Sequence, residues 1–290
     1  QQYQTDAVDS TVQVFSGQPN QGLQEYVLDK GKLFVKSKGT LHEVNDLSLM
    51  EHGYSNQPIT LSDVALLQNL QSIQSANNLN VSSELCQDLG RVSLDIEMET
   101  GTGKTYVYTR TMFELYKRCG FNKFIIAVPT LPIKAGTASF LKEQEVKRHF
   151  EMVCNYNAEI ELCLLEPQKK QKKGRLNMPS AVGHFFYGTH HAKHKIYVLL
   201  LNTQLITNGK LLTREDYDQM LGEFHRPVDA IADTKPVLII DEPHRVERSG
   251  KTYAALIENF RPQLVLRYGA TFPELTVGKG KNKHSVKDYQ

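Results

Sequence analysis

Cysteine is scarce in this 290-residue sequence, and long apolar segments are missing from it. Neither a secretory signal nor an apolar segment long enough to cross a bilayer is present. The cysteines form no C-x-x-C pair and lack the spacing of a zinc site; they are Cys86, Cys119, Cys154 and Cys163. We therefore expect a soluble protein of the reducing cytoplasm that makes no membrane contact.

Acidic residues are absent from residues 167–213, although the whole chain has a formal net charge of only +2. Residues 169–175, the most basic part, have two interpretations: a solvated loop, which is the commoner, or a surface that binds DNA or a partner subunit. His190 and His194 would share a helix face, but no acid or cysteine lies close by in sequence, so a metal site is disfavoured. The basic residues of the whole stretch are Lys169, Lys170, Lys172, Lys173, Arg175, Lys193, Lys195 and Lys210.

Apolar runs of strand length alternate with helix-like segments along the chain. The expected strands cover residues 92–96, 123–128, 159–165, 196–201, 237–240 and 264–268. The expected helices lie near residues 3–15, 62–73, 106–118, 132–150 and 213–221. Near-continuous apolar strands are typical of parallel sheets that are covered on both faces. The pattern predicts a doubly wound α/β domain whose ligands bind at the carboxyl ends of the strands.

A glycine-rich loop lies between the first of these strands and the helix at residues 106–118. In this setting, backbone N–H groups and a helix N-terminus bind phosphate. Lys104 would reach the β- and γ-phosphates, and the Thr105 hydroxyl would hold Mg²⁺. One departure is Met98, which stands where the usual pattern has its first glycine. The loop reads Glu99-Thr100-Gly101-Thr102-Gly103-Lys104-Thr105.

Two acids, Asp241 and Glu242, follow the buried-strand pattern of residues 237–240. In nucleoside triphosphatases, the first acid of such a pair binds Mg²⁺ through water and the second acts as the general base. Taken alone, the pair is equally well explained as a helix N-cap followed by a first-turn acid. Together with the glycine-rich loop, it predicts a site for ATP and Mg²⁺.

Gln4 follows an aromatic residue near the start of the first expected helix. Its amide carries both a donor and an acceptor, which suits the edge of adenine. The alternative is a solvated glutamine in the first turn, and from this residue alone the alternative is favoured.

Five motifs occur in one order, and as a set they resemble the first RecA-like domain of superfamily-2 helicases. The phosphate loop, the run at residues 199–204 and the acid motif are similar to those of Res subunits of type III restriction-modification enzymes, and Met98 fits that branch. The motifs are Tyr3-Gln4, Glu99-Thr100-Gly101-Thr102-Gly103-Lys104-Thr105, Val128-Pro129-Thr130, Asp241-Glu242-Pro243-His244 and Gly269-Ala270-Thr271.

The resemblance implies an ATP-dependent translocase that works on double-stranded DNA with a Mod methyltransferase subunit and cuts DNA with a nuclease domain. Nothing in the sequence matches the second RecA-like domain or the nuclease. Residues 1–290 are therefore expected to be the first RecA-like domain of a longer protein. Residues 17–60, which include an expected strand at residues 31–36, and residues 166–195 are interpreted as insertions.

The resemblance also implies roles for single residues. Glu242 would orient the attacking water, and Mg²⁺ would be held by Thr105 and Asp241. His244 would couple the acid motif to Thr271, or else bond a backbone carbonyl at a helix start. The expected catalytic residues are Lys104, Asp241, Glu242 and His244. The expected nucleotide contacts are Gln4, Thr100, Gly101, Thr102, Gly103, Lys104 and Thr105.

Contacts with the DNA sugar-phosphate backbone are expected from Thr130, Lys134 and Thr203, whose alternative role is to cap the helices that follow. Two other functions stay open. One is a superfamily-2 motor that acts on RNA or in DNA repair. The other is a nucleotide- and DNA-binding module without turnover, because groups of a second domain are missing.

Overall fold

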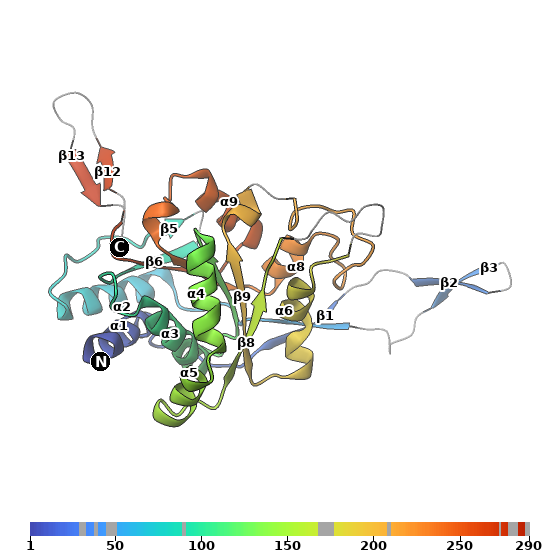
Figure 1. Ribbon diagram of the computed structural model, residues 1–290, viewed down its shortest axis with the longest axis horizontal. Helices are drawn as coiled ribbons and strands as arrows, with labels where there is room; N and C mark the ends of the chain where they lie inside the picture. Colours follow the sequence, from blue (N-terminus) through green and yellow to red (C-terminus); the bar gives the residue numbers. More distant parts are fainter. Residues whose placement is uncertain are drawn as a thin grey trace.

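The computed structural model describes residues 1–28, 33–37, 40–44, 51–88, 91–167, 177–207, 210–272, 274–277 and 284–287. At their centre lies a seven-stranded sheet with the order β5-β6-β11-β10-β7-β9-β8 (Figure 1). The six strands from β6 to β8 in this order are parallel, and β5 pairs antiparallel with β6 at one edge. The predicted α/β fold with a mostly parallel sheet is confirmed.

The elements have the following bounds. The strands of the central sheet are β5 Gln87–Asp88, β6 Arg91–Glu97, β7 Lys123–Val128, β8 Glu159–Leu164, β9 Lys195–Asn202, β10 Val237–Asp241 and β11 Leu264–Gly269. The helices are α1 Gln2–Gln13, α2 Asp63–Ala76, α3 Lys104–Cys119, α4 Leu131–Lys142, α5 Gln144–Arg148, η2 His149–Val153, α6 Ser180–His191, α7 Gln204–Thr207, α8 Pro227–Asp233, η3 Pro243–Arg245 and α9 Lys251–Phe260. None of the described helices is both long and apolar enough to cross a bilayer.

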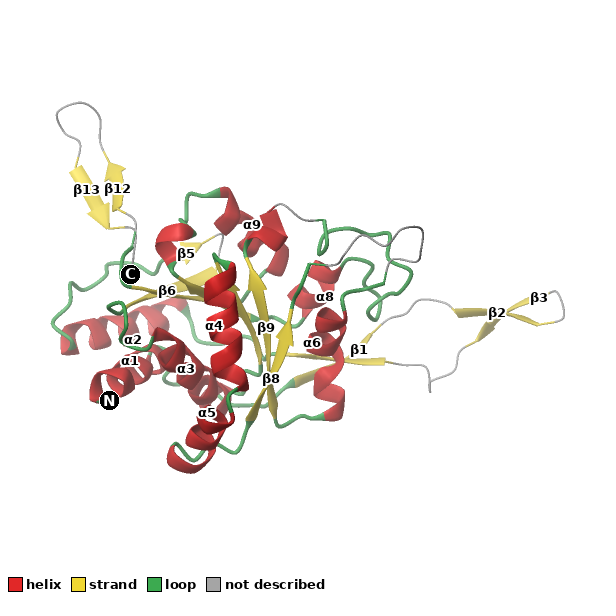
Figure 2. Ribbon diagram, in the orientation of Figure 1, coloured by secondary structure: helices red, strands yellow, loops and turns green. Residues whose placement is uncertain are grey.

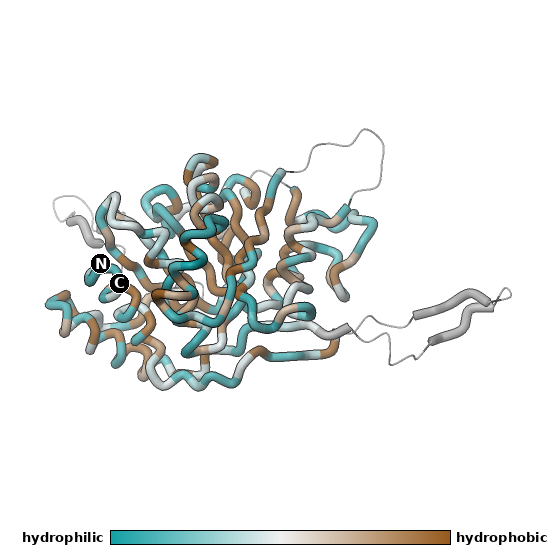
Figure 3. The backbone as a smooth tube through the Cα atoms, turned by 60° about the horizontal axis from the view of Figure 1, so that its bottom comes forward, coloured by the Kyte–Doolittle hydropathy of each residue, from teal (hydrophilic) through white to brown (hydrophobic). Residues whose placement is uncertain are grey.

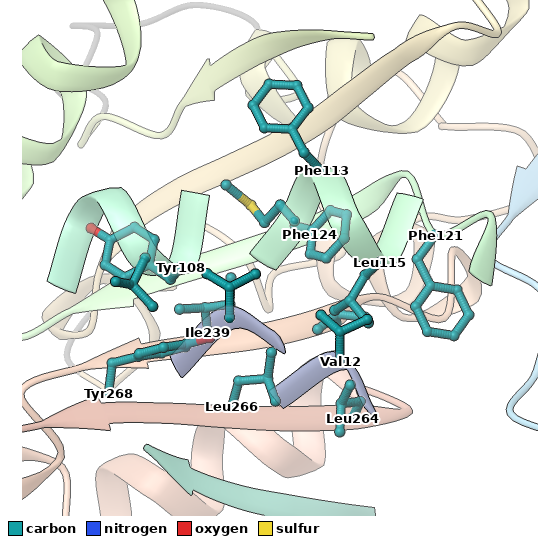
Figure 4. Close-up of a cluster of buried hydrophobic side chains, with 14 of the residues drawn as sticks. Val12, Tyr108, Phe113, Leu115, Phe121, Phe124, Ile239, Leu264, Leu266 and Tyr268 are labelled. Carbon is teal, nitrogen blue, oxygen red and sulfur yellow. The ribbon is translucent and has the colours of Figure 1, made fainter. Parts of the chain in front are cut away.

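The sheet is covered by helices on both faces (Figure 2). Strands β7, β10 and β11 are buried along their whole length. Their successive side chains enter two separate clusters, so Ile239 packs on the face of α1 to α4, whereas Ile240 packs on the face of α6, α8 and α9. Figure 4 shows part of the first cluster, and Figure 3 shows apolar residues gathered in the central strands. Burying each such side chain contributes about 1.5–3 kcal/mol.

The segment before α2 joins the sheet through Asn56, whose side chain is completely buried. Its amide donates to the carbonyl of Lys123 (2.9 Å), and its Oδ1 accepts from the N–H of Asn122 (2.8 Å). Ahead of it, β1 Gln24–Leu28 pairs with β4 Glu51–Ser55, and β2 Leu33–Ser37 pairs with β3 Thr40–Val44. The strand expected at residues 31–36 is thus confirmed as β2 from residue 33 onward.

Two expected helices differ from the structure. The long helix at residues 132–150 is interrupted at Glu143, whose extended backbone separates α4 from α5. The helix expected at residues 213–221 is wrong, since these residues are mostly irregular and end in an isolated bridge at Leu221. There Arg214 makes two 2.6 Å hydrogen bonds with Asp216, a pairing at i and i+2 that a helix does not bring face to face. The basic run at residues 169–175 lies outside the described residues.

Candidate nucleotide-binding site

The predicted phosphate loop connects the carboxyl end of β6 to the first residue of α3, Lys104. Gly101 and Gly103 have φ values of +82° and +83°, a backbone conformation that side chains with a Cβ rarely adopt. The Thr102 hydroxyl donates to the carbonyl of Glu99 (2.6 Å) and closes the loop. The loop therefore ends at a helix N-terminus whose first N–H groups have no partner within the helix, as phosphate binding requires.

Met98, the departure from the usual loop pattern, fits its position for a physical reason. Its side chain is buried in the core cluster, and its N–H donates to the carbonyl of Gly269 (2.8 Å) on β11. Unlike Gly101 and Gly103, it does not have a positive φ. The backbone at this position does not require glycine. The apolar side chain of Met98 can therefore be accommodated, and it anchors the loop to the core.

Asp241 is the last residue of β10 and Glu242 follows it, two strands away from the loop. Glu242 has a left-handed backbone with φ of +59°, and its N–H donates to the carbonyl of Tyr268 (3.1 Å). Its Oε1 lies 3.3 Å from Nζ of Lys104, which is itself 9% exposed. The structure therefore brings the loop lysine and the second acid into an ion pair across β11.

Asp241 is 5% exposed, and its Oδ1 is buried without a hydrogen-bond partner among the described residues. Burial raises the pKa of its carboxyl to about 6, repulsion from Glu242 adds to this, and Lys104 acts in the opposite direction. Thr105 directly follows Lys104 in the first turn of α3, and Lys104 pairs with Glu242, the residue after Asp241. A carboxylate oxygen without a partner and a hydroxyl are hard oxygen donors, and they suit Mg²⁺ with phosphate oxygens completing its shell.

His244 has a different partner from the one expected. Its Nδ1 lies 3.2 Å from Oε2 of Glu242, and the ring is 38% exposed. This contact places the imidazole beside the second acid of the motif. The coupling of His244 to Thr271 stays a prediction.

Gln4 lies against the phosphate loop. Its Nε2 donates to the carbonyl of Thr102 (2.9 Å), and the hydroxyl of Tyr3 donates to the same oxygen (3.2 Å). A Cβ at Gly103 would come within 2.7 Å of this amide nitrogen. The predicted contact with adenine remains a prediction, while the structure shows why position 103 excludes a larger residue.

Sequence reasoning missed two buried tyrosines beneath the loop. The hydroxyl of Tyr108 is 3.2 Å from the Thr137 hydroxyl of α4, and that of Tyr268 donates to Thr111 on α3 (3.0 Å). The two rings meet edge to face at 5.7 Å, and Figure 4 shows them in the same part of the cluster. A tyrosine on the apolar face of a helix needs a hydroxyl partner, which was the available signal.

Sequence reasoning also missed a buried ionic cluster of Asp95, Arg248 and Arg267. Arg248 Nη2 is 2.9 Å from both Asp95 Oδ2 and Ser93 Oγ. Arg267 Nε is 3.4 Å from Asp95 Oδ1, and both side chains are fully buried. The cluster ties β6 and β11 to the segment that follows the acid motif. Only the strand register, which pairs Arg267 with Asp95, could have revealed it.

The residues expected to contact DNA are engaged within the protein. Thr130 caps α4 by accepting from the N–H of Ile133 (3.4 Å). Lys134 is 4% exposed, and its ammonium donates to the carbonyl of Leu165 and lies 3.1 Å from Glu166 Oε1. Lys134 thus holds the end of β8 and does not face solvent. Thr203 is 5% exposed.

A polar hollow of about 730 Å³ opens beside these residues, at the carboxyl ends of β7 and β9. Arg245 and Lys251, which sequence reasoning did not select, are exposed there. No acid occurs among its lining residues in the described part of the chain, so it suits a polyanion. The hollow is lined by Pro129, Thr203, Gln204, Ile206, Thr207, Arg245, Lys251, Thr252 and Ala255.

Comparisons with known proteins point to one family. The family model described as "Type III restriction enzyme, res subunit" matches residues 63–274. The Res subunit of StyLTI from Salmonella typhimurium is 45% identical over 201 residues, which cover 69% of this chain and 20% of the relative. The Res subunits of EcoP15I from Escherichia coli and of EcoPI from Escherichia phage P1 are each 40% identical over 76% of this chain. The chain spans about a fifth of the length of these relatives.

Proposed function

Because this chain belongs to the family of type III restriction enzyme Res subunits, we propose that it is a motor domain that couples ATP hydrolysis to movement along DNA. The observation that carries the proposal is the ion pair of Lys104 with Glu242, which joins the phosphate loop to the acid motif. Asp241, the residue before Glu242, supports it, because its Oδ1 is buried and has no hydrogen-bond partner in the described part of the chain.

The triphosphate would bind at the N-terminus of α3, with its charge neutralised by the backbone N–H groups of the loop and by Lys104. The residues proposed to touch it are Gln4, Thr100, Gly101, Thr102, Gly103, Lys104 and Thr105. Thr105 and Asp241 would hold Mg²⁺, which supplies charge neutralisation at the phosphates when bound. Burial of Asp241 strengthens these interactions relative to water.

Glu242 is the proposed general base. Its carboxylate is 23% exposed, so a water molecule can reach it, and its two oxygens face Lys104 and His244. When Lys104 turns to phosphate, Oε1 of Glu242 becomes available to accept a proton from the attacking water. His244 would hold the other oxygen and so fix the direction of the carboxylate.

The DNA backbone is proposed to lie across the polar hollow at the ends of β7 and β9. Arg245 and Lys251 would pair with phosphates. This surface would be formed in part by Thr130 and Thr203. The buried Lys134 would support it from within. Such contacts carry no base information, so binding would be independent of sequence and weaken steeply with salt.

The relatives are subunits of restriction-modification enzymes, and this chain spans about a fifth of their length. We therefore assign to the chain the motor step alone. A Mod methyltransferase is the proposed partner that reads the DNA sequence, and cleavage is assigned to a nuclease domain outside the chain.

The test is ATP hydrolysis by the intact protein that contains this chain, measured with duplex DNA, with RNA and without nucleic acid. We expect hydrolysis to depend on Mg²⁺ and to be stimulated by duplex DNA only. Stimulation by RNA would support a different superfamily-2 motor. ATP and DNA binding without hydrolysis would support a binding module.

A further inference from the structure

A thiol cluster lies outside the nucleotide site, between α3 and the η2 segment. It consists of Tyr106, His149 and Cys154, which all contact one another. Cys154 Sγ is 3.6 Å from His149 Nε2 and 3.9 Å from the hydroxyl of Tyr106, and that hydroxyl is 3.1 Å from His149 Nε2. The short η2 helix brings His149 and Cys154 together. A thiol beside an imidazole is the arrangement that converts cysteine into a nucleophile.

A cationic side chain and a hydroxyl group lie close to the thiol. The guanidinium of Arg110 lies one turn after Tyr106 on α3 and interacts electrostatically with Cys154. The hydroxyl of Tyr106 is within hydrogen-bonding distance of the sulfur and can donate to it. Cys154 is only partly buried, which leaves the sulfur accessible to a small reagent.

The other cysteines provide a contrast within the same chain. Cys119 and Cys163 are 1% and 2% exposed, and burial raises the pKa of their thiols to about 11 and about 12. They stay protonated and are shielded from reagents. Cys86 is partly buried, as Cys154 is, and so it is the fair comparison for accessibility.

We propose that Cys154 is a site of covalent thiol modification by small-molecule disulfides. His149 Nε2 takes the proton of the thiol, and the thiolate attacks one sulfur of the disulfide. A new S–S bond to Cys154 forms as the old S–S bond breaks, and the other half leaves as a thiolate that takes up the proton. The protein sulfur is oxidised and the leaving half is reduced, so no further reactant is needed.

Modification would be transmitted to the phosphate loop through Tyr106. This residue directly follows Thr105, and its ring stacks on Phe150 at 5.3 Å. A group attached to Cys154 would displace the Tyr106 hydroxyl from its two partners and disturb the first turn of α3. This second part rests on the proposed function, because it predicts weaker nucleotide binding.

The experiment treats the intact, folded protein with oxidised glutathione and follows each of the four cysteines by peptide mass mapping. We expect Cys154 to react at least about tenfold faster than Cys86, with Cys119 and Cys163 unreacted. His149→Gln should slow the reaction of Cys154 by about tenfold and leave the reaction rate of Cys86 unchanged. Equal rates for Cys86 and Cys154 in the wild-type protein, which needs no variant to fold, would overturn the proposal. An unchanged rate in a folded His149→Gln protein would do the same.

Nucleotide affinity is then measured before and after modification, with Cys154→Ser as the control that cannot be modified. A several-fold loss of ATP affinity in the wild type alone supports transmission through Tyr106, and equal affinity before and after overturns it. Selective labelling of Cys154 in a protein that never binds ATP would leave the modification site standing and refute the proposed function. The two failures are therefore distinguishable.

Discussion

The two parts of the sheet edge that sequence motifs mark as functional are built differently. At the ends of β6 and β10, the motif side chains face one another. Lys104 forms an ion pair with Glu242, and no described residue is a hydrogen-bond partner for the buried Oδ1 of Asp241. At β7 and β9, Thr130 and Lys134 bond to the protein itself, and the exposed cations come from Arg245 and Lys251. A small ligand needs a preformed site, whereas a polyanion needs only an exposed basic surface.

The largest effect is expected from Glu242→Gln in the first region, at the ends of β6 and β10. The amide cannot accept a proton from water, so turnover should fall at least about 100-fold, while ATP binding persists because Lys104 and the loop are intact. Steady-state hydrolysis and an ATP titration of the same sample measure the two effects. Glu247→Gln, which changes an exposed acid five residues away, is the matched control. Normal turnover in Glu242→Gln would remove this residue from the role of base.

At the second region, the double change Arg245→Ala and Lys251→Ala should weaken duplex DNA binding and leave ATP affinity unchanged. Loss of two phosphate contacts should reduce the slope of log affinity against log salt by about 2. Fluorescence anisotropy over a salt series measures it. The control is Lys142→Ala with Lys147→Ala, two exposed lysines that do not line the hollow. Equal slopes for both pairs would contradict a DNA path through the hollow.

Asp241→Asn should separate stability from function. The folded-state pKa of about 6 lies above the ordinary value of 3.8, so the folded protein binds this proton more tightly than the unfolded chain. Wild-type stability therefore falls as pH rises from about 4 to about 6, and the variant escapes this loss. Without Mg²⁺ and nucleotide, we expect the variant to be more stable at pH 7.5 by roughly 1–3 kcal/mol, with hydrolysis lost.

Chemical denaturation of both proteins at pH 4 and pH 7.5 measures this difference. The free energies of unfolding should converge at the lower pH. An Asp241→Asn protein that is less stable than wild type at pH 7.5 would show that the buried carboxylate is well satisfied in the folded protein.

The smallest effect is expected from Thr130→Ala, which removes the cap of α4. Loss of this cap should lower the free energy of unfolding by about 1 kcal/mol and leave DNA affinity within twofold of wild type. Thr130→Ser, which keeps the capping oxygen, is the control. A variant with wild-type stability and clearly weaker DNA binding would restore Thr130 as a direct contact.

The same contrast explains what could be predicted from the sequence. The fold and the first region depend on local order, since an apolar strand followed by a glycine loop or by two acids fixes which side chains reach the edge of the sheet. The second region depends on packing between distant segments. Nothing near Lys134 in sequence shows that Leu165 and Glu166 will receive its ammonium.

The helix expected at residues 213–221 failed for a related reason. Its apolar spacing fits a helix, but Tyr217 donates to the carbonyl of Leu211 and Arg214 pairs with Asp216. These side-chain bonds compete with helical hydrogen bonds, and spacing alone does not reveal them.

The central claim is that the phosphate loop and the acid motif form one nucleotide site, and ATP titration of Lys104→Ala tests it most directly. Removing this buried cation should weaken Mg²⁺-dependent ATP binding by at least about 100-fold. Lys117→Ala, which removes an exposed lysine from the same helix, should bind as wild type does. Equal ATP affinity in Lys104→Ala and wild type would contradict the claim.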